Sequence, residues 1–271
     1  MSALASPSIR WAVRDDGSGH AVLLLHGFTG TSAAWDEHAA GLVPRLRVLA
    51  PCLPGHGETV APHDAMSVEA TADALAVLLE RHRAVPAHVV GYSLGARVAL
   101  RLALTHPDAV DRLILESPSP GFETDAERAA RRAADETLAA RLETDGIEAF
   151  VDDWERSPIF ASHAALDPER AARVRAMRLG NEPGGLAASL RHAGQGAMEP
   201  LFDRLGTLHK PTLVIAGALD ELGRPRAERV ATAIPGARLT VVDGAGHTPH
   251  DERPEAFLRL VLEFLEEEPA R

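Results

Sequence analysis

One segment decides the fold of this chain: Val89-Val90-Gly91-Tyr92-Ser93-Leu94-Gly95-Ala96-Arg97. The mostly apolar run 87–90 that leads into it is typical of a buried strand. After it, Leu94 and Val98 are four residues apart, as on one face of a helix. A Gly-x-Ser-x-Gly pattern between a strand and a helix predicts a nucleophile elbow, with Ser93 held in a strained turn. The alternative is a glycine-flanked turn in which Ser93 only caps the helix.

The chain has 271 residues and a formal net charge of −11 at pH 7. This length suits one large domain, or a domain with an insertion. The negative charge argues against nucleic acid or an anionic membrane as the main partner, and an anionic substrate would need a local positive pocket. Cys52 is the single cysteine and cannot form an internal disulfide, which favours a reducing compartment. The sequence shows neither a signal peptide nor an apolar stretch of membrane-spanning length, so we expect a cytoplasmic protein.

Short apolar segments alternate with helical patterns along most of the chain. We expect a turn at residues 15–19 and strands at residues 9–13, 21–25, 46–50, 87–90, 112–115, 212–216 and 238–242. We expect helices between them, among others at residues 67–79, 226–233 and 254–264. Alternation at this spacing predicts an α/β fold, in which helices cover both faces of a mostly parallel sheet.

The alternation stops between residues 118 and 205. This segment is rich in Arg, Glu and Ala, has no clear strand, and shows helical patterns at residues 126–142, 168–177 and 184–192. The simplest interpretation is a helical insertion that lies over the carboxyl edge of the sheet. We therefore expect a core made of residues 1–117 and 206–271, and a cap, or lid, made of residues 118–205.

A nucleophilic serine needs a base within hydrogen-bond reach and an acid that orients the base. His247 follows the last predicted strand in a glycine-rich loop, at the expected catalytic edge, and is our candidate base. His250 is the alternative, three residues later and near the start of a predicted helix. For the acid, Asp220 and Glu116 each follow a strand at the same edge, so spacing alone leaves both open.

An oxyanion hole would complete the site. The candidates are the backbone N–H groups of Leu94, which follows the nucleophile, and of Phe28, which follows His26 and Gly27. We interpret His26 as a structural hydrogen-bonding residue and Cys52 as a small packed residue. The sequence has no paired Cys/His spacing for zinc and no phosphate-binding glycine loop, so we expect neither a metal nor a cofactor.

Further segments carry a family resemblance: Leu25-His26-Gly27-Phe28-Thr29-Gly30, Glu116-Ser117-Pro118-Ser119-Pro120-Gly121, Glu127-Arg128-Ala129-Ala130-Arg131, Phe150-Val151-Asp152-Asp153-Trp154, Pro158-Ile159-Phe160, Arg178 and Gly185-Leu186-Ala187. With the Ser93 elbow and Arg97 four residues after it, they resemble the α/β-hydrolase superfamily over the whole chain. More narrowly, they resemble the 2-succinyl-6-hydroxy-2,4-cyclohexadiene-1-carboxylate synthases, pyruvate-eliminating lyases of menaquinone (vitamin K2) biosynthesis. Two positions depart from the pattern: Ala96 replaces a usual glycine, and Cys52 replaces a common aspartate.

The resemblance implies Asp220 as the acid, in the short loop typical of hydrolases with this architecture. It also implies substrate contacts from Tyr92, Arg97, Arg131, Trp154 and Arg178. Guanidinium groups bind carboxylates through two parallel hydrogen bonds, so arginines above the site fit the several carboxylates of this family's substrate. The alternative for Arg131 and Arg178 is a solvated helix face, and for Tyr92 and Trp154 it is plain packing.

The implied reaction begins with proton abstraction alpha to a carbonyl of 2-succinyl-5-enolpyruvyl-6-hydroxy-3-cyclohexene-1-carboxylate and ends with the loss of pyruvate. Ser93 with His247 acts as the base, backbone N–H groups stabilise the enolate-like charge, and neither an acyl-enzyme nor a cofactor takes part. We expect a small anionic substrate and a monomer or weak homo-oligomer. The competing interpretation is an ester or carbon–carbon bond hydrolase that forms an acyl-enzyme. A non-enzymatic scaffold would have no use for an intact triad.

Overall fold

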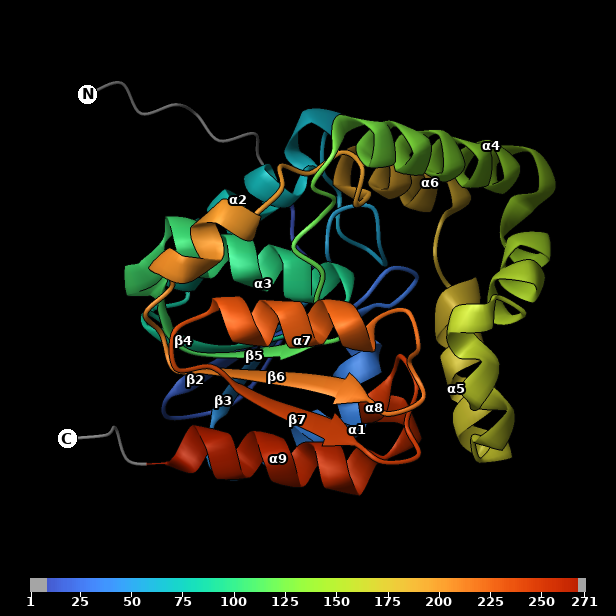
Figure 1. Ribbon diagram of the computed structural model, residues 1–271. Helices are drawn as coiled ribbons and strands as arrows, with labels where there is room; N and C mark the ends of the chain where they lie inside the picture. Colours follow the sequence, from blue (N-terminus) through green and yellow to red (C-terminus); the bar gives the residue numbers. More distant parts are fainter. Residues whose placement is uncertain (1–8, 268–271) are drawn as a thin grey trace.

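The computed structural model describes residues 9–267 of the chain. Residues 1–8, on which the expectation of no signal peptide partly depends, lie outside this range. A seven-stranded sheet with the strand order β1-β3-β2-β4-β5-β6-β7 forms the centre (Figure 1). Its strands are β1 (Val13–Gly17), β2 (Ala21–Leu25), β3 (Arg47–Pro51), β4 (Ala87–Tyr92), β5 (Val110–Glu116), β6 (Thr212–Gly217) and β7 (Arg238–Val242). β1 is antiparallel to β3, and the other neighbouring pairs are parallel, which confirms the predicted fold class.

Helices cover both faces of the sheet, as the alternation of strands and helices predicts. One face carries α2 (Val68–Arg81), α3 (Leu94–Thr105) and α7 (Arg224–Ala233), and the other carries α1 (Asp36–Leu42) and α9 (Pro254–Glu266). An apolar cluster fills the space on each side: Leu75 and Leu100 belong to the first, and Trp35 and Phe257 to the second. Within the described range, no helix combines the length and the apolar character that crossing a membrane requires.

The amino-terminal edge of the sheet differs from the prediction of a strand at 9–13 and a turn at 15–19. The edge strand β1 spans Val13–Gly17 and so includes most of the expected turn, whereas Arg10 forms an isolated bridge with Val60. The charged residues of β1 fit a strand because an edge leaves them accessible to partners. Asp15 accepts two hydrogen bonds from Arg47 on β3, at 2.8 and 2.7 Å. A local sequence pattern contains no information about this distant partner.

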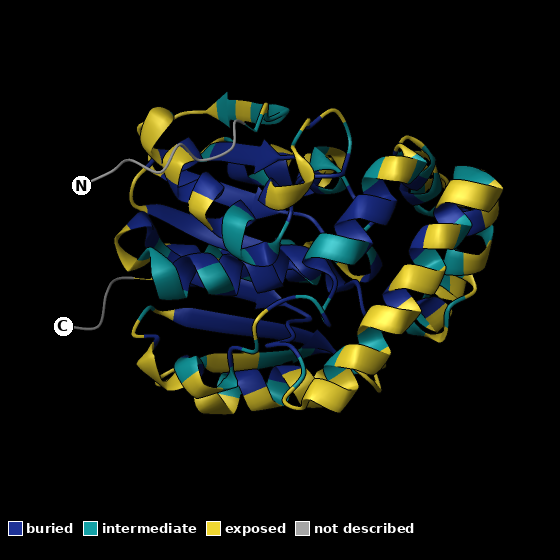
Figure 2. Cartoon of the chain, turned by 90° about the horizontal axis from the view of Figure 1, so that it is seen from above, coloured by how far each residue is buried: buried dark blue, intermediate teal, exposed yellow. Residues whose placement is uncertain are grey.

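Residues 118–205, which we call the cap, lie across the carboxyl edge of the sheet (Figure 1). Their helices are α4 (Asp125–Glu155), α5 (Pro168–Leu179) and α6 (Pro183–Ala193), with a 3₁₀ segment at Pro158–Ala165. α4 extends beyond the predicted helix 126–142, because the helix resumes after a break at Gly146, whose φ of 80° favours glycine. Leu142 and Phe150 of α4 share an apolar cluster with Leu186 of α6. Figure 2 shows that the central strands of the sheet are buried, whereas the edge strand β1 and the outer sides of the cap helices are partly or fully exposed.

Glycines allow α3 to rest directly on the end of a neighbouring strand. A β-carbon on Gly95 would lie 2.1 Å from the carbonyl oxygen of Leu25, the last residue of β2. A β-carbon on Gly91 would lie 2.4 Å from the carbonyl oxygen of Gly95. Both neighbours are backbone atoms, which cannot rotate aside as a side chain can. The sharp turn predicted from the Gly-x-Ser-x-Gly pattern therefore has a direct steric cause.

Substitution of Gly95 tests this contact. We expect Gly95→Ala to lower the free energy of unfolding by about 1–3 kcal/mol, because an extra carbon atom must displace packed backbone. Gly184→Ala in α6 is the matched control, since a β-carbon there meets no atom within 4 Å. The control should leave the stability unchanged or raise it by up to about 1 kcal/mol. Urea unfolding followed by circular dichroism measures both variants, and equal stability of Gly95→Ala and the parent chain would contradict the steric argument.

Candidate active site

Ser93 stands at the turn between β4 and α3. Its φ of 49° and ψ of −103° are strained for a residue with a side chain. Two backbone hydrogen bonds hold this conformation. The N–H of Ser93 donates to the carbonyl oxygen of Glu116 at 2.9 Å, and the N–H of Arg97 donates to the carbonyl oxygen of Ser93 at 3.1 Å. The turn thus fixes the serine between β5 and the first turn of α3.

Ser93, His247 and Asp220 form one hydrogen-bonded chain. Nε2 of His247 lies 3.3 Å from Oγ of Ser93, and Nδ1 of His247 lies 2.7 Å from Oδ2 of Asp220. The other carboxylate oxygen, Oδ1, accepts the backbone N–H of Gly223 at 2.8 Å. Burial would raise the pKa of Asp220, but the hydrogen bonds from His247 and from the N–H of Gly223 outweigh it and hold this pKa below its ordinary value. An ionised Asp220 assigns the ring proton to Nδ1 and leaves Nε2 free to accept the serine proton.

Backbone contacts bring the acid and the base together. Asp220 follows β6, and His247 follows β7, in two adjacent loops at the same edge. A β-carbon on Gly217, the last residue of β6, would lie 2.0 Å from the carbonyl oxygen of Gly246, so the two loops touch through their main chains. On the opposite side, Oγ of Ser117 donates to the carbonyl oxygen of His247 at 2.9 Å. His247 is therefore positioned through its backbone, by Ser117, as well as through its ring, by Asp220.

Glu116 and His250, the alternative acid and base, form a separate buried pair. Oε1 of Glu116 accepts the backbone N–H of His250 at 2.8 Å and its Nδ1–H at 2.9 Å. Burial lowers the pKa of His250, but the charges of Glu116 and Asp251 outweigh it and raise this pKa to about 9. His250 is therefore a cation at neutral pH. The ring of Tyr92 contacts both histidines, with its centre 5.5 Å from that of His247 and 4.6 Å from that of His250.

Phe28 and Leu94 lie beside Ser93 in the wall of one cavity, as an oxyanion hole made from their backbone N–H groups requires. Leu94 is the first residue of α3, where N–H groups have no partner inside the helix and the helix dipole favours negative charge. His26 has a structural role, as expected from the sequence: its Nε2 accepts the N–H of Leu53 at 2.8 Å. Complete burial lowers the pKa of His26 to about 3, so its ring is neutral.

A cavity of about 500 Å³ lies between the cap and the elbow, and Ser93 and His247 both line it. The cap contributes three aromatic residues to its wall, Phe150, Trp154 and Phe160, and the core contributes Phe28 and Tyr92. The size is typical of a site for a small molecule, and an apolar wall keeps bulk water away from the reacting groups.

Arg97 and Arg131 line this cavity, as the resemblance implies. Arg97 is 6% exposed, and burial lowers its pKa to about 10, so it remains a cation at neutral pH. One of its N–H groups, at Nη1, donates to the carbonyl oxygen of Ala193 at 2.6 Å, and Nε of Arg131 donates to Asp135 at 2.8 Å. A guanidinium has five N–H donors, so each arginine keeps donors for a ligand.

Arg178 is placed differently from the prediction. It lines a neighbouring cavity of about 480 Å³ and is not among the residues around Ser93. Its guanidinium carbon lies 4.7 Å from the centre of the Phe160 ring, which lines both cavities, and Nη1 pairs with Glu155 at 3.1 Å. Helical periodicity can assign a residue to a face of a helix, but it cannot show which of two adjacent cavities that face borders.

Three charged residues of the cavity wall, Arg141, Asp153 and Arg226, were not anticipated from the sequence. Arg141 and Asp153 form an ion pair with each other. Arg226 lies on α7, six residues after Asp220, with its guanidinium carbon 5.6 Å from the centre of the Phe122 ring. Arg226 is near the start of α7, the helix that follows the loop of Asp220, and this position in the sequence indicates a residue close to the catalytic edge.

The chain is similar to known proteins over most of its length. The family described as the alpha/beta hydrolase fold matches residues 20–254. A protein of Bacillus subtilis (strain 168), provisionally named a 2-succinyl-6-hydroxy-2,4-cyclohexadiene-1-carboxylate synthase, is 38% identical over 96% of this chain and 96% of its own. A synthase of the same name from Enterobacter sp. (strain 638) is 31% identical over 90% of this chain and 91% of its own. The solved structure of MenH from S. aureus matches with a TM-score of 0.90 and 33% identity, over 94% of this chain and 97% of its own.

The buried Glu116–His250 pair predicts a pH-dependent stability. The pKa of His250 is about 9 in the folded chain and close to 6.5 when unfolded. The pair's contribution is therefore fully present below pH 6.5 and is lost as the pH rises through 9. We expect Glu116→Gln to lower the free energy of unfolding by on the order of 3 kcal/mol at pH 6, and by clearly less at pH 9.

Urea unfolding at the two pH values measures this difference. Asp73→Asn is the control, because Asp73 forms an exposed pair with His106 at 2.7 Å and exposed pairs contribute little. It should change the stability by less than about 1 kcal/mol at either pH. A pH-independent effect of Glu116→Gln would show that the charge of His250 is not what the carboxylate stabilises.

Proposed function

The chain belongs to the α/β-hydrolase family, and from this premise we propose that it is a 2-succinyl-6-hydroxy-2,4-cyclohexadiene-1-carboxylate synthase. It eliminates pyruvate from 2-succinyl-5-enolpyruvyl-6-hydroxy-3-cyclohexene-1-carboxylate in menaquinone biosynthesis. One observation carries the proposal: the hydrogen-bonded chain of Ser93, His247 and Asp220 shares a cavity with the guanidinium groups of Arg97 and Arg131. The chain supplies a base, and the arginines fit a substrate with several carboxylates.

Ser93 and His247 act together as the base. Nε2 of His247 takes the hydroxyl proton of Ser93 while Oγ removes the proton alpha to a carbonyl of the substrate. The electrons of that C–H bond form a carbon–carbon double bond, and the bond to the enolpyruvyl oxygen breaks, so pyruvate leaves. The imidazolium returns a proton to the departing group, while Asp220 stays ionised and stabilises the imidazolium. The serine works as a proton relay and forms no acyl-enzyme.

The negative charge that develops on the substrate carbonyl meets the backbone N–H groups of Phe28 and Leu94. The carboxylates of the substrate pair with Arg97 and Arg131, which line the cavity and have N–H donors beyond those used by Ala193 and Asp135. Tyr92 and Trp154 form part of the wall. Arg178 stays a predicted contact, and its guanidinium lies against the Phe160 ring, which lines both cavities.

The compartment and the substrate class of the enzyme follow from its cysteine content and from the size of its cavity. We place the enzyme in the cytoplasm, because a chain with the single cysteine Cys52 gains no internal disulfide from an oxidising compartment. Its substrate is a small polycarboxylate that the cavity can hold. The competing activity is hydrolysis of a neutral ester through acylation of Ser93, which the same triad and oxyanion hole could perform.

Removal of triad members tests the assigned roles. We expect Ser93→Ala and His247→Ala each to lower kcat for pyruvate release by roughly 10³- to 10⁶-fold, because the residues act as a unit. Asp220→Asn should lower kcat by about 10⁴-fold through the wrong histidine tautomer. Glu116→Gln, assayed where it is folded, should retain most of the activity. A coupled dehydrogenase assay for pyruvate gives kcat, and near-normal turnover by Ser93→Ala would remove the serine from the mechanism.

Substitution of the arginines separates the lyase from a hydrolase. Arg97→Ala and Arg131→Ala should each cut kcat/KM for pyruvate release by well over tenfold, because a desolvated carboxylate left without its partner loses about 2–5 kcal/mol of binding. Hydrolysis of a neutral aryl ester should scarcely change, since that substrate has no carboxylate. Arg97→Lys should recover only part of the first activity, because an ammonium cannot form the two parallel hydrogen bonds of a guanidinium.

Arg173→Ala is the matched control for these variants, because Arg173 lies on the cap helix α5 with 60% of its side chain exposed. It should behave like the parent enzyme in both assays. If the parent enzyme releases no pyruvate, or if Arg97→Ala and Arg131→Ala lose both activities equally, the lyase proposal fails and the ester hydrolase takes its place.

A further inference from the structure

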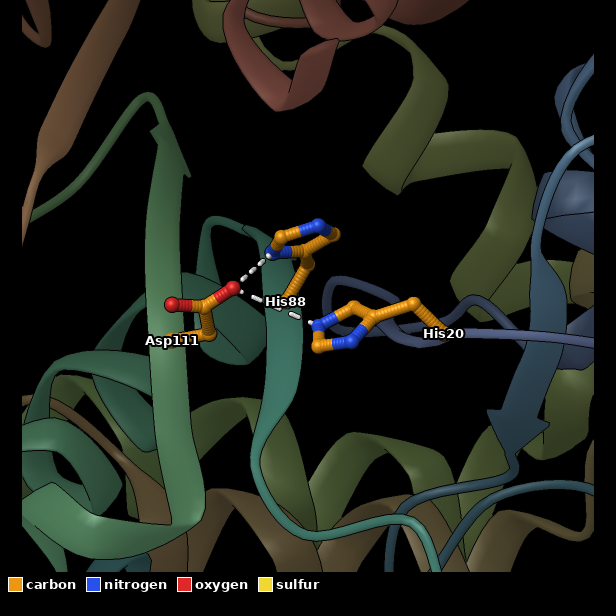
Figure 3. Close-up of side chains that lie close together, drawn as sticks. All are labelled: His20, His88 and Asp111. Atoms are coloured by element: carbon orange, nitrogen blue, oxygen red, sulfur yellow. Dashed lines mark ion pairs between the residues drawn. The ribbon is translucent and has the colours of Figure 1, made fainter. Parts of the chain in front are cut away.

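A second group of chemically capable side chains lies at the opposite end of the sheet from the catalytic site. His20 directly precedes β2, His88 is on β4, and Asp111 is on β5, and these three strands are neighbours. Figure 3 shows the two imidazole rings and the carboxylate facing one another. Ser93 comes five residues after His88, so roughly 16 Å of strand separates this group from the elbow.

An irregularity in the pairing of β4 with β5 turns Asp111 toward the histidines. Two residues of β5, Asp111 and Arg112, oppose His88 alone, which is the arrangement of a β-bulge. Val110 and Leu113, on either side of the bulge, pack into the same apolar cluster. Residues three apart in a regular strand would point to opposite faces. The extra residue therefore changes the direction in which the Asp111 side chain points. Bulges of this kind are often found next to functional sites.

The three side chains converge on one point. Oδ2 of Asp111 lies 3.3 Å from Nε2 of His20 and 3.3 Å from Nδ1 of His88. The side chain of His88 is 7% exposed. Its Nδ1 is close to Asp111 but makes no hydrogen bond with it or with any other residue that the structure describes. A buried polar atom without a partner destabilises a fold and calls for a ligand that completes it.

We propose that His20, His88 and Asp111 bind one divalent transition-metal ion of the zinc class. A tetrahedral ion with bonds of about 2.0–2.1 Å to nitrogen and oxygen holds its donor atoms roughly 3.4 Å apart. The two separations of 3.3 Å match this value, and all three donor atoms lie within 4.8 Å of one another. The side chains of His20 and Asp111 are 39% and 44% exposed, which leaves room for water as the fourth ligand.

The donor set selects the class of metal. Magnesium and calcium ions prefer oxygen ligands, whereas two of the three donors here are imidazole nitrogens. Imidazole suits zinc, copper and nickel, and one carboxylate is compatible with all three. At pH 7 an ordinary histidine is mostly neutral and offers its lone pair to a metal. Zinc, which favours four ligands in a tetrahedron, fits the observed spacing best.

The alternative is an ordinary ion pair between Asp111 and one protonated histidine. Charge-assisted hydrogen bonds are about 2.7–2.9 Å long, shorter than either separation here. An ion pair also gives no reason for a second imidazole to face the same carboxylate oxygen. Arg112, the adjacent cation, is turned away, because its Nη1 donates to the carbonyl oxygen of Phe264 at 3.2 Å. A bound cation explains the whole arrangement.

The ion would join three strands at the amino end of the sheet and would take no part in the chemistry around Ser93. Its effect is therefore on stability. The absence of paired Cys/His spacing predicts no metal, but these three side chains are far apart in the sequence and come together from three neighbouring strands. The proposal is independent of the proposed lyase function.

Zinc titration of the chelator-treated, full-length protein tests the site. Isothermal titration calorimetry with ZnCl₂ in excess MgCl₂ should show one zinc ion bound per chain. At a free zinc concentration about 100 times Kd, the Tm should rise by roughly 5–10 °C. His20→Ala and Asp111→Asn change partly exposed residues, so they preserve the fold, and each should weaken zinc binding by more than about tenfold.

Two further variants distinguish this site from others. His106→Ala removes a histidine that pairs with Asp73 on the surface, and it should bind zinc like the parent protein. His247→Ala removes the catalytic histidine and should also keep the full zinc stoichiometry. The proposal is overturned if the parent protein binds no zinc, if His20→Ala and Asp111→Asn bind it as tightly as the parent, or if only His247→Ala abolishes binding.

Discussion

Main-chain contact at the carboxyl edge of the sheet is the constraint on which the catalytic geometry depends. α3 begins against the end of β2, where a β-carbon on Gly95 would lie 2.1 Å from a backbone oxygen. The loops after β6 and β7 touch in the same way at Gly217, where a β-carbon would lie 2.0 Å from the carbonyl oxygen of Gly246. Backbone atoms cannot rotate out of such contacts, so the positions of nucleophile, acid and base are set before any side chain is considered. The hydrogen bonds of Ser93, His247 and Asp220 then form between groups that are already in place, which is the preorganisation that catalysis requires.

The same edge holds two pairs of a histidine and a carboxylate, and their surroundings give them different tasks. His250 is 2% exposed and lies beside the fully buried Glu116. The negative charge of this carboxylate stabilises the imidazolium, so His250 is a cation within the core. His247 borders the cavity and keeps one ring nitrogen directed at Ser93. Glu116 nevertheless contributes to the active site through its main chain, because its carbonyl oxygen accepts the N–H of Ser93. Glu116, which the spacing alone could not exclude as the acid, therefore holds the elbow through its backbone hydrogen bond with Ser93.

Much of this arrangement could be predicted from the sequence, because strong local patterns carry it. The apolar runs predict the parallel strands, and the glycines around Ser93 predict the elbow. The errors occurred where distant partners decide the outcome. The charged strand β1 is stabilised by Arg47, and the length of α4 depends on a helix that resumes after Gly146. The choice between Asp220 and Glu116 could not be made from spacing, because both follow a strand at one edge. The side of Phe160 on which Arg178 lies is likewise a property of tertiary packing.

A cavity lined by arginines in a chain of net charge −11 needs a local explanation, and the cap provides one. Arg97 belongs to the core helix α3, yet it is buried by the cap, since it donates to the carbonyl oxygen of Ala193 at the end of α6. Burial strengthens the attraction of its charge for an anion and removes competing water. The hydrogen-bonded chain of Ser93, His247 and Asp220 and the proposed oxyanion hole come from the core alone, and such groups would serve many substrates. Under the proposed function, selectivity for a carboxylate therefore arises at the contact between core and cap, where Arg97 of the core donates to Ala193 of the cap.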